Sequence, residues 1–159
     1  MRFKNKTVIV TGAGSGIGET TAIKFAQEGA NVVIADIDPI NGNTVTSKIN
    51  EANGSALFVE TDVASFEAIN DMVNKTINEF DLPDILINNA GINVFGEPLS
   101  MPDSEWKRAF SVDLDGVWFG CKAVLPHMLK KNKGSIVNVA SVHGIQIIPN
   151  CFPYPVAKH

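Results

Sequence analysis

The sequence predicts an α/β protein in which helices cover both faces of a doubly wound parallel sheet. Short apolar runs rich in β-branched residues, typical of strands buried on both faces, alternate with longer segments of helical periodicity. Parallel strands need crossover helices, so five such strands separated by four helices predict three layers. The 159 residues suit one domain, and we expect residues 1–159 to form a single domain.

The first three elements show the pattern most clearly. A β-branched run predicts a strand at 7–10, and a glycine-rich turn then leads into a helix. Gly29 is placed to stop that helix, and the strand pattern returns at 31–35.

The later elements repeat this alternation. Ser65 is a candidate N-cap for a helix whose apolar side chains are three and four residues apart. The last helix is long and is expected to bend at Pro126. The remaining helices are expected at 42–53, from 66 onward and at 104–131, and the remaining strands at 56–60, 84–87 and 135–139.

Composition excludes several classes of function. The net charge is −4 and Lys and Arg are scattered along the chain, so we expect no nucleic-acid partner. No apolar run approaches a membrane span, and the N-terminus lacks the apolar region of a signal peptide. Cys121 and Cys151 match no metal or redox spacing. We therefore expect a reduced, cytoplasmic protein without a metal site or a membrane partner.

A glycine-rich turn at 11–18 follows the first strand. Glycines let a phosphate approach backbone N–H groups, and a helix N-terminus adds unpaired donors and positive charge. The spacing is not G-x-G-x-x-G, because Ile17 stands in place of the third glycine, and no Gly-Lys-Ser/Thr of a P-loop follows. It matches T-G-x-x-x-G-x-G, with Gly12, Gly16 and Gly18 in the glycine places. A turn without a ligand is the less favoured alternative.

This motif resembles the cofactor signature of the short-chain dehydrogenase/reductase family. Asp36 ends the second strand about 20 residues after the glycines, where a carboxylate suits the ribose hydroxyls of NAD and repels the 2′-phosphate of NADP. Ile37 and Asp38 supply no cation for that phosphate. We therefore expect NAD(H) to be preferred over NADP(H), with turn capping by Asp36 as the alternative.

Two further motifs follow the third and fourth strands in the family's order. The resemblance implies that Asp62 and Val63 lie beside the adenine ring, although Asp62 alone is equally a loop residue. It also implies that the N-N-A-G motif at 88–91 lines the cofactor ribose. The predicted cofactor-binding residues are Gly12, Ser15, Gly16, Ile17, Gly18, Asp36, Asp62, Val63, Asn89, Ala90, Gly91, Tyr154 and Lys158.

Three residues near the end of the sequence form a candidate catalytic group. Tyrosine ionises near pH 10, so it needs a nearby cation to act as an acid or base at neutral pH. Tyr154 and Lys158 are four apart, on one face if helical, and Ser141 closes the fifth strand. A serine followed by Y-x-x-x-K is the family's catalytic pattern. The resemblance implies that Tyr154 is the general acid/base, that Lys158 assists it and holds the nicotinamide ribose, and that Ser141 orients the substrate.

The sequence departs from the family pattern in two ways. Many members have an asparagine in the long helix that supports a proton relay through water, and Asp113 stands in its place. Asp113 is therefore a candidate catalytic residue, and whether a carboxylate can replace the amide stays open. Family members also continue well past the lysine, so we expect a fragment of a longer enzyme rather than a natural short product.

The resemblance implies that residues 1–159 form a single dinucleotide-binding (Rossmann-type) domain that is incomplete. It also implies interconversion of a secondary alcohol and a ketone, and residues 150–159 resemble those of members acting on sugars, polyols and sugar acids. A non-catalytic NAD-binding or regulatory module is the alternative, and a zinc-dependent alcohol dehydrogenase lacks the ligand spacing. The resemblance implies a homo-oligomer, dimer or tetramer, when complete. Two polar residues either face the substrate pocket or simply lie in a loop: His143 and Gln146. Four aromatic residues belong either to a subunit interface or to the core: Trp106, Phe110, Trp118 and Phe119.

Overall fold

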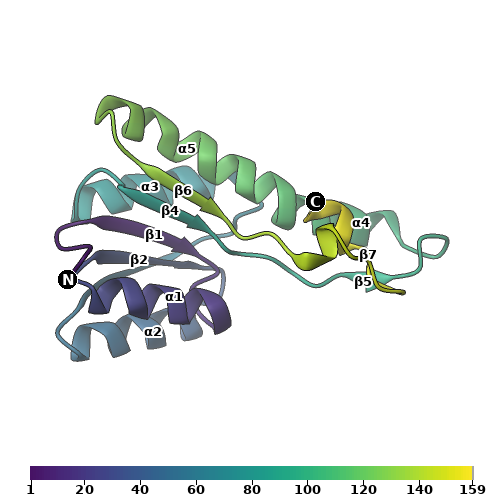
Figure 1. The fold of residues 1–159 in the computed structure, drawn as a ribbon, viewed down its shortest axis with the longest axis horizontal. Helices are drawn as coiled ribbons and strands as arrows, with labels where there is room; N and C mark the ends of the chain where they lie inside the picture. Colours follow the sequence, from purple (N-terminus) through teal and green to yellow (C-terminus); the bar gives the residue numbers. More distant parts are fainter. Residues whose placement is uncertain (159) are drawn as a thin grey trace.

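A five-stranded parallel sheet forms the centre of the computed structural model, which describes residues 1–158 (Figure 1). Its strands are β1 (Thr7–Thr11), β2 (Asn31–Asp36), β3 (Ser55–Glu60), β4 (Ile85–Asn88) and β6 (Ser135–Asn138). The order across the sheet is β3-β2-β1-β4-β6, which confirms the predicted doubly wound fold. The order reverses between β1 and β4, and ligands of such sheets bind beyond the carboxyl ends of the strands at this point.

Four helices cover the sheet, two on each face (Figure 1). One face carries α1 (Gly16–Gln27) and α2 (Pro39–Glu51), and the other carries α3 (Phe66–Glu79) and α5 (Gly116–Lys130). Side chains alternate along β1, as the two-residue period of a strand requires. Val8 and Val10 pack in the core under α1 and α2, whereas Ile9 packs in the core under α3 and α5.

The ends of three helices show how local chemistry sets their bounds. Gly29, with φ +89°, follows α1, as predicted. The Ser65 hydroxyl accepts a hydrogen bond from the Ala68 N–H at 3.2 Å, which confirms the predicted N-cap of α3. Helix α2 begins three residues before the predicted start at 42. Asp38 caps it and Pro39 occupies its first turn, where a proline loses no hydrogen bond.

The predicted long helix at 104–131 is present but not uniform. It consists of α4 (Asp103–Phe110), a π-helical turn η1 (Ser111–Asp115) and α5. Single π turns are frequent at functional sites, and this one contains Asp113, which is 2% exposed. The helix predicted at 104–131 is thus continuous over 103–130, and its π-helical turn was not predicted because the apolar periodicity continues through it.

A small extension beyond the carboxyl edge of the sheet was not predicted (Figure 1). Strands of two residues are too short to give a periodic sequence pattern, and here they form an antiparallel pair. The extension includes α4, β5 (Phe95–Gly96), a 3₁₀ turn η2 (Val142–Gly144), β7 (Phe152–Pro153) and α6 (Tyr154–Ala157).

The aromatic residues of the long helix have different surroundings. Trp106 stacks on Phe110 and on Phe152, with ring centroids 4.2 and 5.4 Å apart. Phe119 packs against the core cluster under α3 and α5. Only Trp118 of the four is largely exposed, at 60%, so three of them stabilise the chain itself.

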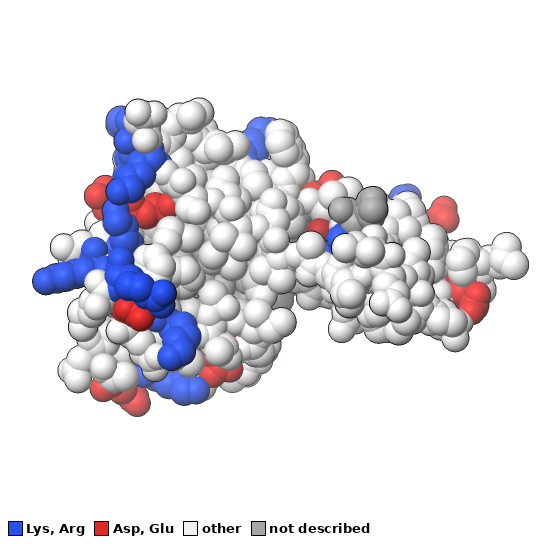
Figure 2. All heavy atoms as spheres, in the orientation of Figure 1, with Lys and Arg blue, Asp and Glu red and all other residues white. Residues whose placement is uncertain are grey.

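Basic side chains gather at the end of the molecule opposite this extension (Figure 2). Arg2, Lys6 and Lys133 line one groove there. Lys6 and Lys131 both bind Asp84, at 3.1 and 2.9 Å, so part of this positive charge is neutralised. Basic residues that are scattered along the sequence gather here in space because segments far apart in the sequence meet at this end. No helix within residues 1–158 is long and apolar enough to cross a membrane.

Candidate functional site

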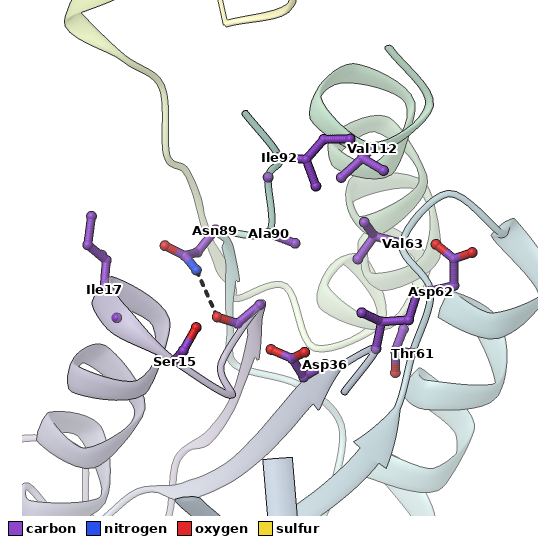
Figure 3. Close-up of a pocket in the computed structure, with 14 residues that line it drawn as sticks. Ser15, Ile17, Asp36, Thr61, Asp62, Val63, Asn89, Ala90, Ile92 and Val112 are labelled. Atoms are coloured by element: carbon purple, nitrogen blue, oxygen red, sulfur yellow. Dashed lines mark hydrogen bonds between the residues drawn. The ribbon is translucent and has the colours of Figure 1, made fainter. Parts of the chain in front are cut away.

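A cleft of about 390 Å³ opens at the carboxyl edge of the sheet, where β1 and β4 lie side by side (Figure 3). The structure brings together here ten of the predicted cofactor-binding residues, and Ile37, Thr61, Ile92 and Val112 add to the lining. The ten are Gly12, Ser15, Gly16, Ile17, Asp36, Asp62, Val63, Asn89, Ala90 and Gly91.

The glycine turn packs closely against the loop that follows β4. Gly12 has φ +62°, and a Cβ on it would lie 2.8 Å from the Cα of Ala90. A Cβ on Gly18 would meet the carbonyl oxygen of Gly12. Ser15 is the N-cap of α1, but its side chain caps none of the helix N–H groups. The hydroxyl of Ser15 and the first N–H groups of α1 are therefore donors that an anionic ligand can use.

Thr11 and Asn89 tie the two loops together. The Thr11 hydroxyl oxygen accepts hydrogen bonds from the N–H groups of Asn89 and Ala90, at 3.0 and 3.1 Å. The Asn89 side chain donates to the carbonyl oxygens of Thr11 and Gly12, at 3.0 and 3.2 Å, the second of which is drawn in Figure 3. Sequence reasoning missed the role of Thr11. The only indication of this role in the sequence is the position of Thr11, directly before the first glycine of the turn.

Two carboxylates lie on the cleft. One oxygen of Asp36 accepts from the Gly14 N–H at 2.7 Å and the other from the Asp38 N–H at 3.0 Å. Asp36 therefore braces the glycine turn, and each oxygen retains a lone pair for a ligand hydroxyl. Asp62 is exposed and accepts from the Ala64 N–H at 2.9 Å, so it also orders the loop before α3.

The candidate catalytic residues lie in the extension. The Lys158 N–H donates to the Tyr154 carbonyl at 3.1 Å, so the two residues are one helical turn apart, on one face of α6. The Tyr154 ring makes edge contacts with Phe95 and His143, at centroid distances of 5.7 and 6.1 Å. The Ser141 hydroxyl accepts from the His143 N–H at 3.2 Å. His143 thus lies beside the predicted acid/base, as one of its two sequence interpretations required.

Asp113 is buried beside Lys158. Its Oδ1 atom accepts from the Ile92 N–H at 2.9 Å and lies 3.7 Å from the Lys158 Nζ atom. Burial raises the pKa of the Asp113 carboxyl, although the Ile92 N–H and the Lys158 cation oppose the shift. Within residues 1–158, no group of three or more His, Cys, Asp or Glu side chains could hold a metal ion.

Known proteins resemble the chain in both sequence and fold. Meso-2,3-butanediol dehydrogenase of Serratia marcescens is 43% identical over 145 residues, which are 91% of this chain and 57% of that protein. Glucose 1-dehydrogenase 2 of Bacillus subtilis (strain 168) is 38% identical over 87% of this chain and 55% of its own length. The chain therefore spans little more than half the length of these curated relatives.

A solved structure shows the same fold. It is a 7α-hydroxysteroid dehydrogenase complexed with NADH and 7-oxo glycochenodeoxycholic acid. Its TM-score is 0.94 at 32% sequence identity, and the match covers 99% of this chain and 61% of that one. Residues 6–159 match the family described as short chain dehydrogenase. These matches show that the chain belongs to the short-chain dehydrogenase family.

Proposed function

We propose that the cleft binds NAD(H), in preference to NADP(H), and that the protein interconverts a secondary alcohol and a ketone. The observation that carries the proposal is the tied pair of loops at the end of β1 and β4. Gly12 and Gly18 leave no room for a Cβ in this turn, and the first N–H groups of α1 are available to a phosphate. This donor set fits a dinucleotide. The NADH complex of the hydroxysteroid dehydrogenase supports it.

Each part of the cleft has a proposed role in binding. The turn at Ser15–Ile17 supplies N–H donors to the pyrophosphate, and the Asp36 carboxylate accepts from the ribose hydroxyls. Asp36 also repels a 2′-phosphate, and Ile37 beside it has no charge to offset that repulsion. Asp62 and Val63 line the adenine end. Asn89, Ala90 and Gly91 line the opposite side, toward Lys158.

The nicotinamide ring, when bound, supplies or accepts the hydride, and the residues of the chain move the proton. In ketone reduction the Tyr154 hydroxyl donates its proton to the substrate oxygen, and in alcohol oxidation the phenolate takes it back. Lys158 stabilises the phenolate and binds the nicotinamide ribose. The Ser141 hydroxyl hydrogen-bonds the substrate oxygen and polarises it. Asp113, at the position where many family members have an asparagine, pairs with the Lys158 ammonium and holds it in position.

The substrate is proposed to be a small hydroxylated molecule. The residues around Tyr154 resemble those of family members acting on sugars, polyols and sugar acids. The names of two relatives, a butanediol dehydrogenase and a glucose dehydrogenase, support this class. The similar solved structure is that of a hydroxysteroid dehydrogenase, which is named for a larger alcohol. A substrate screen in which only larger secondary alcohols react would therefore contradict the proposal.

A homo-oligomer is proposed for the complete protein. Four exposed apolar residues form an uncovered stripe along η1 and α5, at successive spacings of four, seven and four residues: Leu114, Trp118, Leu125 and Leu129. A second copy of the chain, with the same stripe, is the proposed partner. Sedimentation of wild type and of Trp118→Lys tests this, because a charge in the stripe should shift the larger species toward the monomer.

Fluorescence titration with NADH and with NADPH tests the cofactor proposal. We expect saturable NADH binding and much weaker NADPH binding, and we expect Asp36→Ala to reduce that difference. Equal affinities in wild type would contradict the role of Asp36. If neither cofactor binds, the cleft of this chain is not the site. NADH binding without turnover of any alcohol or ketone would favour the non-catalytic alternative.

A further inference from the structure

Asp113 and Lys158 form a buried pair of opposite charges. Their side chains are 0% and 7% exposed, and the Nζ and Oδ1 atoms are 3.7 Å apart. Oδ1 is also bound by the Ile92 N–H, but the buried Oδ2 has no hydrogen-bond partner. Among the side-chain nitrogen and oxygen atoms of residues 1–158, Oδ2 alone is buried in this way. A buried carboxylate with half of its acceptors unused is costly, so its charge needs an explanation.

The pair lies between the cofactor cleft and a second cavity. Gly91 lines the cleft, and a Cβ on it would lie 2.9 Å from Asp113 Oδ1 and 3.0 Å from Lys158 Nζ. On another side, Asp113 and Lys158 both line a cavity of about 160 Å³ together with Asn138. The backbone of Gly91 therefore lies between the pair and the cofactor cleft.

Few other charges face these groups. Arg108 of α4 acts on Asp113 from a distance, but it is exposed and binds Glu105 at 2.8 Å. The Tyr154 ring is faced by His143 of η2, and Lys158 follows one turn later as the C-cap of α6. Lys158 thus pairs with the Asp113 carboxylate and is also the helical neighbour of Tyr154, four residues along the chain. Two anions that share one buried cation disfavour each other.

The backbone contact does not require a charge at this position. The Ile92 N–H needs only an acceptor, and an amide oxygen would serve equally well. Burial raises the pKa of the Asp113 carboxyl. Tyrosine, however, ionises in the alkaline range, where the carboxyl is charged. The Asp113 carboxylate can therefore compete for Lys158 with a phenolate, since both anions exist in that range.

We propose that Asp113 is a positioning residue that competes with the Tyr154 phenolate for Lys158 and so keeps Tyr154 protonated to higher pH. The catalytic meaning of this inference rests on the proposed function. Protonated Tyr154 is the form that donates to a ketone, so the carboxylate extends the pH range of reduction and moves alcohol oxidation to more alkaline pH. An amide at the same place would favour oxidation closer to neutrality.

Tyr154 is the only tyrosine in the sequence, so the ultraviolet absorbance of tyrosinate reports on it alone. We expect Asp113→Asn to lower the pH midpoint of tyrosinate formation by about one unit or more. Asp115→Asn is the matched control, because Asp115 lies in the same π turn and is exposed, and we expect no shift. An unchanged or higher midpoint in folded Asp113→Asn overturns the proposal.

Two further measurements keep the test decisive. Circular dichroism at each pH shows whether wild type, Asp113→Asn and Asp115→Asn are folded. The three proteins must also unfold at the same denaturant concentration. Asp113→Ser also removes the charge and retains an acceptor for Ile92, so it should shift in the same direction. If neither variant folds, the carboxylate serves the structure and the proposal fails. The titration of tyrosinate needs no cofactor. A protein that shows the shift but does not bind NADH would therefore support the competition for Lys158 and contradict only the proposed function.

Discussion

Thr11 provides a direct test of how the cofactor cleft is built. Its hydroxyl is the shared acceptor for the N–H groups of Asn89 and Ala90, and the residue is 2% exposed. Thr11→Val keeps the shape and leaves both N–H groups without a partner. A buried polar group left unpaired costs about 1–3 kcal/mol. Two such groups, partly relieved by movement of the loop, should lower the free energy of unfolding by about 2–4 kcal/mol.

Urea unfolding followed by tryptophan fluorescence measures this loss, and Thr44→Val is the matched control. The Thr44 hydroxyl also makes a hydrogen bond, to the Ile40 carbonyl at 2.8 Å, but Thr44 lies in α2 and is exposed. Its replacement should change stability by no more than about 0.5 kcal/mol. Thr11→Val should also weaken NADH binding, because the two loops separate. Equal stability of the two variants would refute the view that Thr11 ties the loops.

Three other substitutions test separate features of the chain. Gly18→Ala should abolish NADH binding, measured by nicotinamide fluorescence, because its Cβ collides with the Gly12 carbonyl and opens the turn. Burial raises the pKa of Asp84, but bonds from Lys131, the Thr7 N–H and Lys6 outweigh burial and hold that pKa below its ordinary value. Asp84 therefore stabilises the fold above the pKa of the unfolded chain, and this contribution is lost as pH falls through the lowered value. Asp84→Asn should cost about 2–3 kcal/mol at pH 7 in denaturant unfolding, and the difference from wild type should disappear in acid; a constant difference across pH would exclude the charge as the cause. Replacing Asp36 with Asn should narrow the preference for NADH over NADPH in paired titrations, and an unchanged ratio would assign Asp36 to bracing the turn alone.

The sheet and its helices could be predicted because their signals are repeated. Each strand is a short apolar run, rich in β-branched residues in β1, β2, β4 and β6, and each helix has apolar side chains at intervals of three and four. The end of a helix depends on one or two residues, so the start of α2 was placed three residues late, at 42 instead of at Pro39. The two-residue strands β5 and β7 carry no period at all, and only their tertiary contacts define them.

The residues of the cleft could be predicted for a geometric reason. The carboxyl ends of parallel strands meet at one edge, so motifs that follow β1, β2, β3 and β4 must converge there. Hydrogen-bond partners could not be predicted, because residue order does not show which loops touch. The bond between Thr11 and Asn89 and the pair of Asp113 with Lys158 both join distant segments. Their roles in binding and catalysis stay predictions.

The two halves of the site depend on different contacts, and this has a consequence for function. The glycine turn, Asp36 and Asn89 extend directly from strands buried in both cores, so the proposed cofactor site is anchored in the core of the chain. Tyr154 and Lys158 follow short elements held largely by aromatic contacts with Phe95 and with Trp106, which stacks on Phe152. Regions with few buried contacts open at lower free energy than a core. Loss of catalytic geometry therefore need not remove the cofactor site, and binding and turnover have to be measured separately.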